Sequence, residues 1–156
     1  MITNLESHLM RRDPGSYALI LKAPETGTAQ IGRLGAIEFH GDWFVYVGSA
    51  FGPGGVEARV GHHRRPKRSC HWHIDYLLRE VRIEEVWYTH DPVKREEEWA
   101  EAFRTDPLAS NPLRRFGAGD CGCDGHLFRL AERPAVERLT ARLRELGTGG
   151  YDVHVG

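Results

Sequence analysis

The stretch that decides the fold is "SYALILKAPETGTAQIGRLGAIEFHGDWFVYVGSA", residues 16–50. Apolar, β-prone runs lie at 16–24, 29–40 and 43–50, and turn-forming residues separate them. Gly41 and Asp42, between the second and third runs, suit a two-residue type II′ hairpin. The pattern therefore predicts that the chain opens with an antiparallel β-meander.

Downstream, the pattern alternates between helices and strands. The glycines of "SAFGPGG" at 49–55 interrupt the β pattern, and the Asp91–Pro92 pair is a strong helix start. We expect helices at 53–63, 71–81, 92–104 and 133–147, and strands at 83–90 and 126–132. We divide the chain into a leader at 1–14, a single domain at 15–146 and a loosely held tail at 147–156.

Composition narrows the class of protein. The 156 residues fit one compact domain, and 40% hydrophobic with 28% charged residues is ordinary for a soluble globular chain. No apolar run of about 18 residues and no secretory h-region are visible, so we expect a cytoplasmic protein without a membrane partner. The three cysteines are a poor basis for a disulfide framework, which agrees with a reducing compartment.

A net charge of −1 gives no global attraction to nucleic acid, but one segment is strongly basic. "RVGHHRRPKRSCHWHIDYLL", residues 59–78, contains four histidines and five Lys or Arg. Arg59 and His63 lie one helical turn apart on the face of Val56 and Val60, where they could jointly hold a phosphate. The alternative is a solvated basic face. That alternative suits the other basic residues, which would grip a nucleic-acid backbone non-specifically: His62, Arg64, Arg65, Lys67 and Arg68.

A carboxylate also lies on a face that should be buried. Glu96 shares a helical stripe with Val93, Trp99, Ala100 and Phe103. An inward-facing carboxylate is costly unless it is paired, hydrogen-bonded or bound to a metal. The alternative is a Glu at a helix end that reaches solvent or pairs with an Arg.

Two tripeptides set these residues in a recognisable order. "GSY" ends at Tyr17 and "YVG" begins at Tyr46, and Arg59, His63 and Glu96 follow. This order resembles the GIY-YIG nuclease superfamily. Across residues 15–130, the blocks "YVGSA", "RVGHH", "HWHIDYLL", "EEEWA" and "FGAGDCGCDGHLF" resemble the single-domain Uri-type endonucleases more closely.

The resemblance implies a mixed α/β (α+β) sandwich, in which a small antiparallel β-sheet is flanked by helices. The segment at 25–43 reads as an extra β insertion between the two motifs. The resemblance further implies that Tyr17 is the general base and that Tyr46 positions the nucleophile. It implies that Arg59 stabilises the charge of the phosphate and that His63 accompanies it. Glu96 would be the ligand of one Mg²⁺ or Mn²⁺ ion.

The expected activity is therefore metal-dependent hydrolysis of DNA phosphodiester bonds, with RNA left open as the alternative substrate and with no nucleotide cofactor. No recognition module is visible, so we expect a structure-directed or single-strand-directed endonuclease. The alternative is a non-catalytic module that binds nucleic acid through the basic helix at 59–68. A third reading is a small zinc-stabilised interaction domain.

Two blocks remain open. In "HWHIDYLL", His71 and Asp75 are four residues apart, so a helix would let the carboxylate orient the imidazole, while His73 points elsewhere. This block could hold a catalytic His71 or contact DNA, or it could be a hydrogen-bond network beside packed Trp72 and Tyr76. Asp120 is a candidate for the superfamily's late asparagine. A tetrahedral zinc site would use Cys70, Cys121, Cys123 and His126, but buried structural thiols on a tight turn are the favoured reading.

Overall fold

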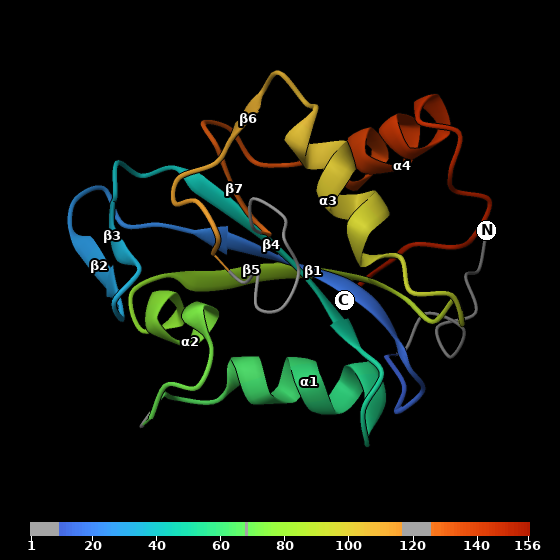
Figure 1. Ribbon diagram of the computed structural model, residues 1–156, viewed down its shortest axis with the longest axis horizontal. Coiled ribbons are helices and arrows are strands. Elements are labelled where there is room, and N and C mark those ends of the chain that lie inside the picture. Colours follow the sequence, from blue (N-terminus) through green and yellow to red (C-terminus); the bar gives the residue numbers. More distant parts are fainter. Residues whose placement is uncertain (1–9, 68, 117–125) are drawn as a thin grey trace.

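The computed structural model describes residues 10–67, 69–116 and 126–156 (Figure 1). Within these ranges lie four helices, a six-stranded sheet and a separate two-stranded sheet. The strands are β1 Gly15–Lys22, β2 Thr28–Ile31, β3 Gly35–Glu38, β4 Trp43–Ala50, β5 Arg82–Thr89, β6 Ala109–Ser110, β7 Leu127–Leu130 and β8 His154–Val155. The helices are α1 Gly55–Arg64, α2 His73–Leu78, α3 Glu96–Arg104 and α4 Val136–Glu145. None of these helices is long and apolar enough to cross a membrane.

The central strand of the main sheet is β1. The strand order is β6-β7-β4-β1-β5-β8, and each neighbouring pair is antiparallel. Every residue of β1 except Lys22 is buried, because both faces of the strand are covered. The expected fold class, a mixed α/β fold with a small antiparallel sheet and flanking helices, is confirmed.

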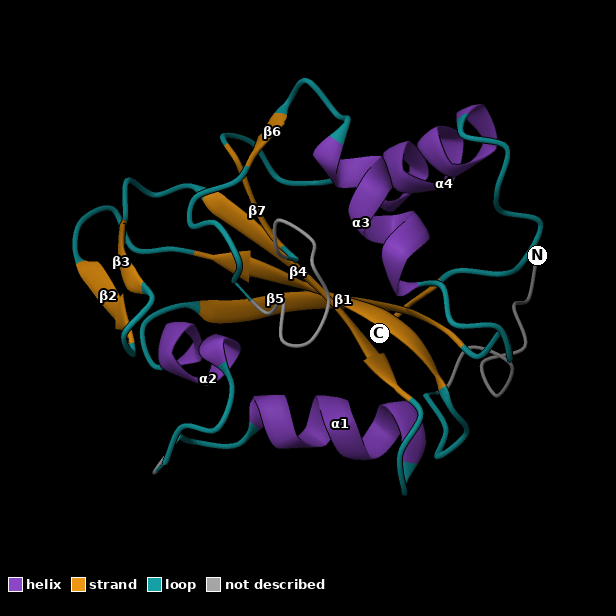
Figure 2. Cartoon of the chain, in the orientation of Figure 1, coloured by secondary structure: helices purple, strands orange, loops and turns teal. Residues whose placement is uncertain are grey.

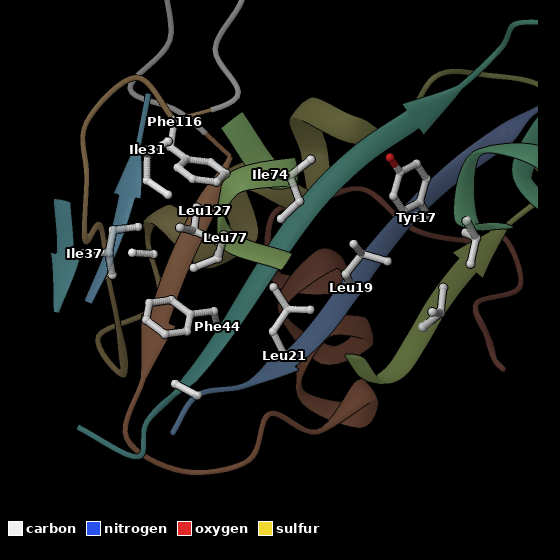
Figure 3. Close-up of a cluster of buried hydrophobic side chains, with 14 of the residues drawn as sticks. Tyr17, Leu19, Leu21, Ile31, Ile37, Phe44, Ile74, Leu77, Phe116 and Leu127 are labelled. Carbon is white, nitrogen blue, oxygen red and sulfur yellow. The ribbon is translucent and has the colours of Figure 1, made fainter. Parts of the chain in front are cut away.

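The sheet separates two hydrophobic clusters. Side chains alternate along β1, so Tyr17, Leu19 and Leu21 enter the cluster that α1, α2 and the β2–β3 hairpin cover (Figure 3). Ala18 and Ile20 enter the opposite cluster, which α3 and α4 cover. Figure 1 shows the two helix pairs on opposite sides of the sheet.

The predicted hairpin at Gly41 and Asp42 is wrong. β3 pairs with β2 in the separate small sheet, and β4 pairs with β1 from end to end (Figure 2). Gly41 and Asp42 instead bond back to Pro24 and Ala23, where they close the β1–β4 pair. The eight-residue β4 pairs with β1, in which every residue except Lys22 is buried, whereas β3 has four residues, of which one is buried.

The predicted strand at 29–40 is also divided. Gly32 has a φ of +49°, and the Leu34 amide donates to the Ile31 carbonyl, so the chain turns between β2 and β3. The insertion therefore forms a hairpin outside the main sheet (Figure 2).

Two helix starts differ from the prediction. α3 begins at Glu96 instead of Pro92, because the Arg95 amide donates to the Ser16 hydroxyl and the Arg95 guanidinium to Asp91. These bonds hold the preceding turn outside the helix. α2 covers only His73–Leu78, since the Asp75 carboxylate accepts the backbone N–H groups that precede it.

The prediction of a loosely held tail at 147–156 is wrong. Its β8 pairs with β5, and Gly156 exchanges two backbone hydrogen bonds with Val86. The Tyr151 hydroxyl accepts a hydrogen bond from the indole of buried Trp99. The tail therefore completes one edge of the sheet.

Two glycine substitutions test the packing of β1. A Cβ at Gly15 would lie 2.0 Å from the Thr89 carbonyl oxygen, so Gly15→Ala should lower the free energy of unfolding by about 2 kcal/mol or more. A Cβ at Gly61, inside α1, would meet nothing within 4 Å. Gly61→Ala should therefore raise the same quantity by about 0.5–1 kcal/mol. Urea unfolding of both variants measures this difference, and equal effects would contradict the close approach of β1 to β5.

Candidate active site

Two tyrosines lie on one face of the central strand pair. Tyr17 of β1 is opposite Gly48 of β4, and Tyr46 is opposite Leu19, so both side chains point to the α1 side. Tyr17 is 1% exposed, and Figure 3 shows it in line with Leu19 and Leu21. A Cβ at Gly48 would lie 2.6 Å from the Tyr17 hydroxyl oxygen. The glycine of "YVG" therefore makes room for the tyrosine of "GSY".

Helix α1 brings an imidazole and a guanidinium to the same place. Its buried Val56 and Val60 pack against the sheet and set the rotation of the helix. His63 Nε2 then lies 2.7 Å from Tyr17 Oη, in a buried hydrogen bond. Arg59 Nη1 donates to the Ser49 carbonyl oxygen at 3.0 Å.

Glu96, the first residue of α3, reaches the same end of β4. Its Oε1 accepts a hydrogen bond from Ser49 Oγ at 2.5 Å, and its Oε2 lies 2.6 Å from His126 Nδ1. The Glu96 side chain is 17% exposed. The inward-facing carboxylate is thus paired with an imidazole and a hydroxyl. Ser49 connects it to Arg59, because the Ser49 backbone accepts from one residue and its hydroxyl donates to the other.

Burial sets the protonation of the polar groups. It raises the pKa of Tyr17 well above 10.0, and it also raises the pKa of Tyr46, with the Glu96 carboxylate as the next contributor. Burial, followed by the charge of Lys67, lowers the pKa of His63 from 6.5 to about 3. Burial alone would raise the pKa of Glu96, but hydrogen bonds from His126 and Ser49 outweigh it and lower that pKa.

At neutral pH the site therefore contains a neutral Tyr17, a neutral His63 and an ionised Glu96. The Tyr17–His63 hydrogen bond therefore joins two uncharged groups. Arg59 supplies a positive charge close to this pair. A weak base, a cation and a carboxylate at the end of one strand pair are the groups that phosphoryl-ester hydrolysis uses.

The carboxylate has the chemistry of a magnesium ligand. Mg²⁺ is commonly bound through one or two protein carboxylates, with waters and substrate phosphates as the other ligands. Glu96 is such a hard oxygen ligand, and its lowered pKa keeps it ionised. Among the described residues, no group of three or more His, Cys, Asp or Glu is arranged to hold a metal by itself. Glu96 could therefore supply one protein ligand to a divalent ion.

The proposed zinc ligands divide into two sets. Cys70 is a free thiol, and His126 is paired with Glu96. Cys121 and Cys123 lie outside the described residues, and so does Asp120, so these assignments stay predictions.

The residues predicted to grip a nucleic-acid backbone are not equivalent. Arg64 and Arg65 are exposed at the end of α1, and the His62 side chain is 36% exposed. The Lys67 side chain is only 4% exposed, because its ammonium donates to the His62 carbonyl and lies 3.9 Å from Asp75. Lys67 therefore stabilises this corner of the fold, and Arg68 lies outside the described residues.

The predicted His71–Asp75 pair is wrong. His71 precedes α2 and is exposed, and Asp75 accepts its backbone N–H at 2.9 Å. The orphan N–H groups at a helix start attract a carboxylate strongly, which explains this arrangement. The imidazole beside Asp75 belongs to His62, at 3.6 Å, while the His73 ring lies 5.7 Å from that of Phe116.

Ser49 is a neighbour of the site that the sequence analysis does not single out, and Trp72 and His126 have other neighbours than the sequence predicts. Ser49 stands in the quoted block "YVGSA", where alternation with Gly48 is a signal that it faces α3. Trp72, predicted as a packing residue, has the Arg59 guanidinium carbon over its ring, 4.9 Å from the centroid. The pairing of His126 with Glu96 has no local sequence signal, because the two residues are distant in the chain.

The depressed pKa of His63 should appear in the pH dependence of stability. The unfolded chain takes up a proton below pH 6.5 and the folded chain does not until about pH 3, so stability should fall as the pH drops through this window. The expected slope from this residue is about 1.4 kcal/mol per pH unit. Urea unfolding between pH 7 and pH 4 measures the slope, which should be shallower in His63→Gln. An unchanged slope in that variant would contradict a neutral buried imidazole.

Comparison with known protein families gives a match over most of the chain. The family described as "Domain of unknown function DUF123" matches residues 16–148, a range that contains every residue of the site. No curated protein and no solved structure matches the chain. Because the match covers most of the sequence, the chain belongs to the DUF123 family.

Proposed function

We propose that the protein is a metal-dependent endonuclease of the GIY-YIG type that hydrolyses phosphodiester bonds in DNA. The observation that carries this proposal is the buried 2.7 Å hydrogen bond between Tyr17 and His63, beside Arg59 and near Glu96. Tyr17, Tyr46 and His63 lie together on the α1 side of the β1–β4 pair. Ser49 connects Arg59 on this side to Glu96 on the α3 side, because its carbonyl accepts from Arg59 and its hydroxyl donates to Glu96.

Proton transfer would pass through two residues. Because the pKa of Tyr17 is well above 10.0, its side chain is protonated at neutral pH before the reaction begins. The phenol gives its proton to His63 Nε2 while it accepts one from the attacking water. The resulting hydroxide forms the new P–O bond, and the leaving alkoxide oxygen departs with the electron pair of the bond that breaks. The negative charge of bound phosphate would raise the low pKa of His63 and make the imidazole a better acceptor.

The phosphate would be held by charge. The carbonyl of Ser49 and the ring of Trp72 hold the Arg59 guanidinium, and a fork with five N–H donors has further donors for phosphate oxygens. Glu96 would hold one Mg²⁺ or Mn²⁺, which stabilises the developing charge on the phosphate when bound. Ser49 and His126 would keep the Glu96 carboxylate ionised and oriented.

The exposed cations near the site are few. Arg64 and Arg65 extend the positive charge beyond α1, so binding should weaken steeply with salt. This favours a structure-directed or single-strand-directed nuclease over a sequence-specific one, with DNA as the proposed partner in the cytoplasm and RNA as the alternative. The exposed pair also favours a second candidate, a module that binds nucleic acid through the helix at 59–68 without cutting it. In such a module the Tyr17–His63 hydrogen bond would only satisfy two buried polar groups.

Cleavage of end-labelled single-stranded and duplex DNA with Mg²⁺ or Mn²⁺ tests the proposal. Tyr17→Phe removes the proton that passes to His63, and Glu96→Gln removes the anionic ligand, so each should lower kcat about 10²–10⁴-fold. The matched controls are Tyr76→Phe, on α2, and Glu101→Gln, later in α3, and both should cut like the wild type.

The proposal fails if the wild-type protein binds DNA and never cleaves it with either metal, and the binding module then takes its place. Equal losses in Glu96→Gln and Glu101→Gln would contradict the special place of Glu96.

A further inference from the structure

Trp72 is an exposed aromatic residue at the edge of the candidate site. It is 43% exposed and belongs to neither hydrophobic cluster. The Arg59 guanidinium carbon lies over its ring, 4.9 Å from the centroid, and the His62 ring meets it edge-on at 76° with the ring centroids 5.0 Å apart. The indole therefore borders the cation that we place on the phosphate.

A buried carboxylate fixes the backbone of Trp72. Asp75 is 0% exposed, and its Oδ2 accepts the Trp72 amide at 3.0 Å. Its Oδ1 lies 3.6 Å from His62 Nε2 and 3.9 Å from Lys67 Nζ. A buried charge is costly unless it is paired, and here the Trp72 amide, His62 and Lys67 surround it. Asp75 thus fixes the backbone from which the indole projects.

A hollow of about 190 Å³ adjoins the indole. Apart from Arg59, His62 and Trp72, its walls are made of small residues, namely Ala50, Gly52, Pro53, Gly55 and Ala58. The hollow therefore lies between the start of α1 and the indole, with the Arg59 guanidinium on its wall. A planar group could enter beside Trp72 while its attached phosphate stays near Arg59.

We propose that Trp72 is a stacking platform for an unpaired base of single-stranded DNA, next to the phosphate that Arg59 holds. This inference rests on the proposed function and names its substrate class. Bases inside a duplex are stacked on each other and hide their faces, whereas a single strand can offer a base to an aromatic side chain. Every base has a π-face, so such a platform is tolerant of sequence.

Binding without cleavage tests the platform. In a metal-free buffer with chelator, we would measure the Kd of a short single-stranded DNA, of the same strand with abasic sites, and of its blunt duplex. The wild-type protein should bind the intact strand roughly fivefold to a hundredfold more tightly than the abasic strand. Trp72→Ala should lose this preference, and Trp72→Phe, the matched aromatic control, should keep most of it. The abasic strand makes the test independent of any loosening of Arg59 in the Ala variant.

The outcomes separate the two proposals. Equal affinity of the wild type for the intact and abasic strands would overturn the platform, even if the protein cleaves DNA. A preference for the intact strand that survives in Trp72→Ala would overturn it as well. If the preference depends on Trp72 and no cleavage occurs with Mg²⁺ or Mn²⁺, the platform stands and the nuclease proposal fails. Tight duplex binding that is unaffected by Trp72→Ala would contradict single-stranded DNA as the substrate class.

Discussion

The register of the β1–β4 pair, in which Tyr17 lies opposite Gly48, is the constraint on which the site depends. Side chains alternate along both strands, so a slip of one residue would turn Tyr17 and Tyr46 toward α3 and α4. Both motif glycines serve this pairing. Gly15 allows the close approach of β5, and Gly48 leaves room for the Tyr17 ring. The glycines of the two motifs thus leave the space that lets the Tyr17 phenol pack on the face of the sheet.

Burial gives the site its electrostatic character. Tyr17 and His63 are kept neutral because the charged form of either would lose hydration, and Glu96 stays ionised because two hydrogen bonds compensate its burial. The neutral phenol and imidazole therefore lie between the positive charge of Arg59 and the negative charge of Glu96, and both charges act on the pKa of Tyr17.

The inserted hairpin supports the site indirectly. Ile31 and Ile37 of the hairpin pack in one cluster with Ile74 and Leu77 of α2. This packing anchors the short helix, and Asp75 at its start then holds the segment that carries Trp72. The β2–β3 hairpin, predicted as an added strand, therefore supports α2, which carries Asp75, and the segment before it, which carries Trp72.

The sequence by itself determined the features that repeat locally. The apolar run of β1 and the helical spacing of Val56, Arg59 and His63 were enough to predict a mixed fold and the common face of these side chains. Only the tertiary structure decided which strands pair, because the Gly41 turn is compatible with a hairpin and the stronger apolar match between β1 and β4 overrides it. The same holds for the pairing of Glu96 with His126 and of Asp75 with His62. These partners come from separate segments of the chain. A buried carboxylate must be paired, but only the packed fold determines which donor lies close enough to pair with it.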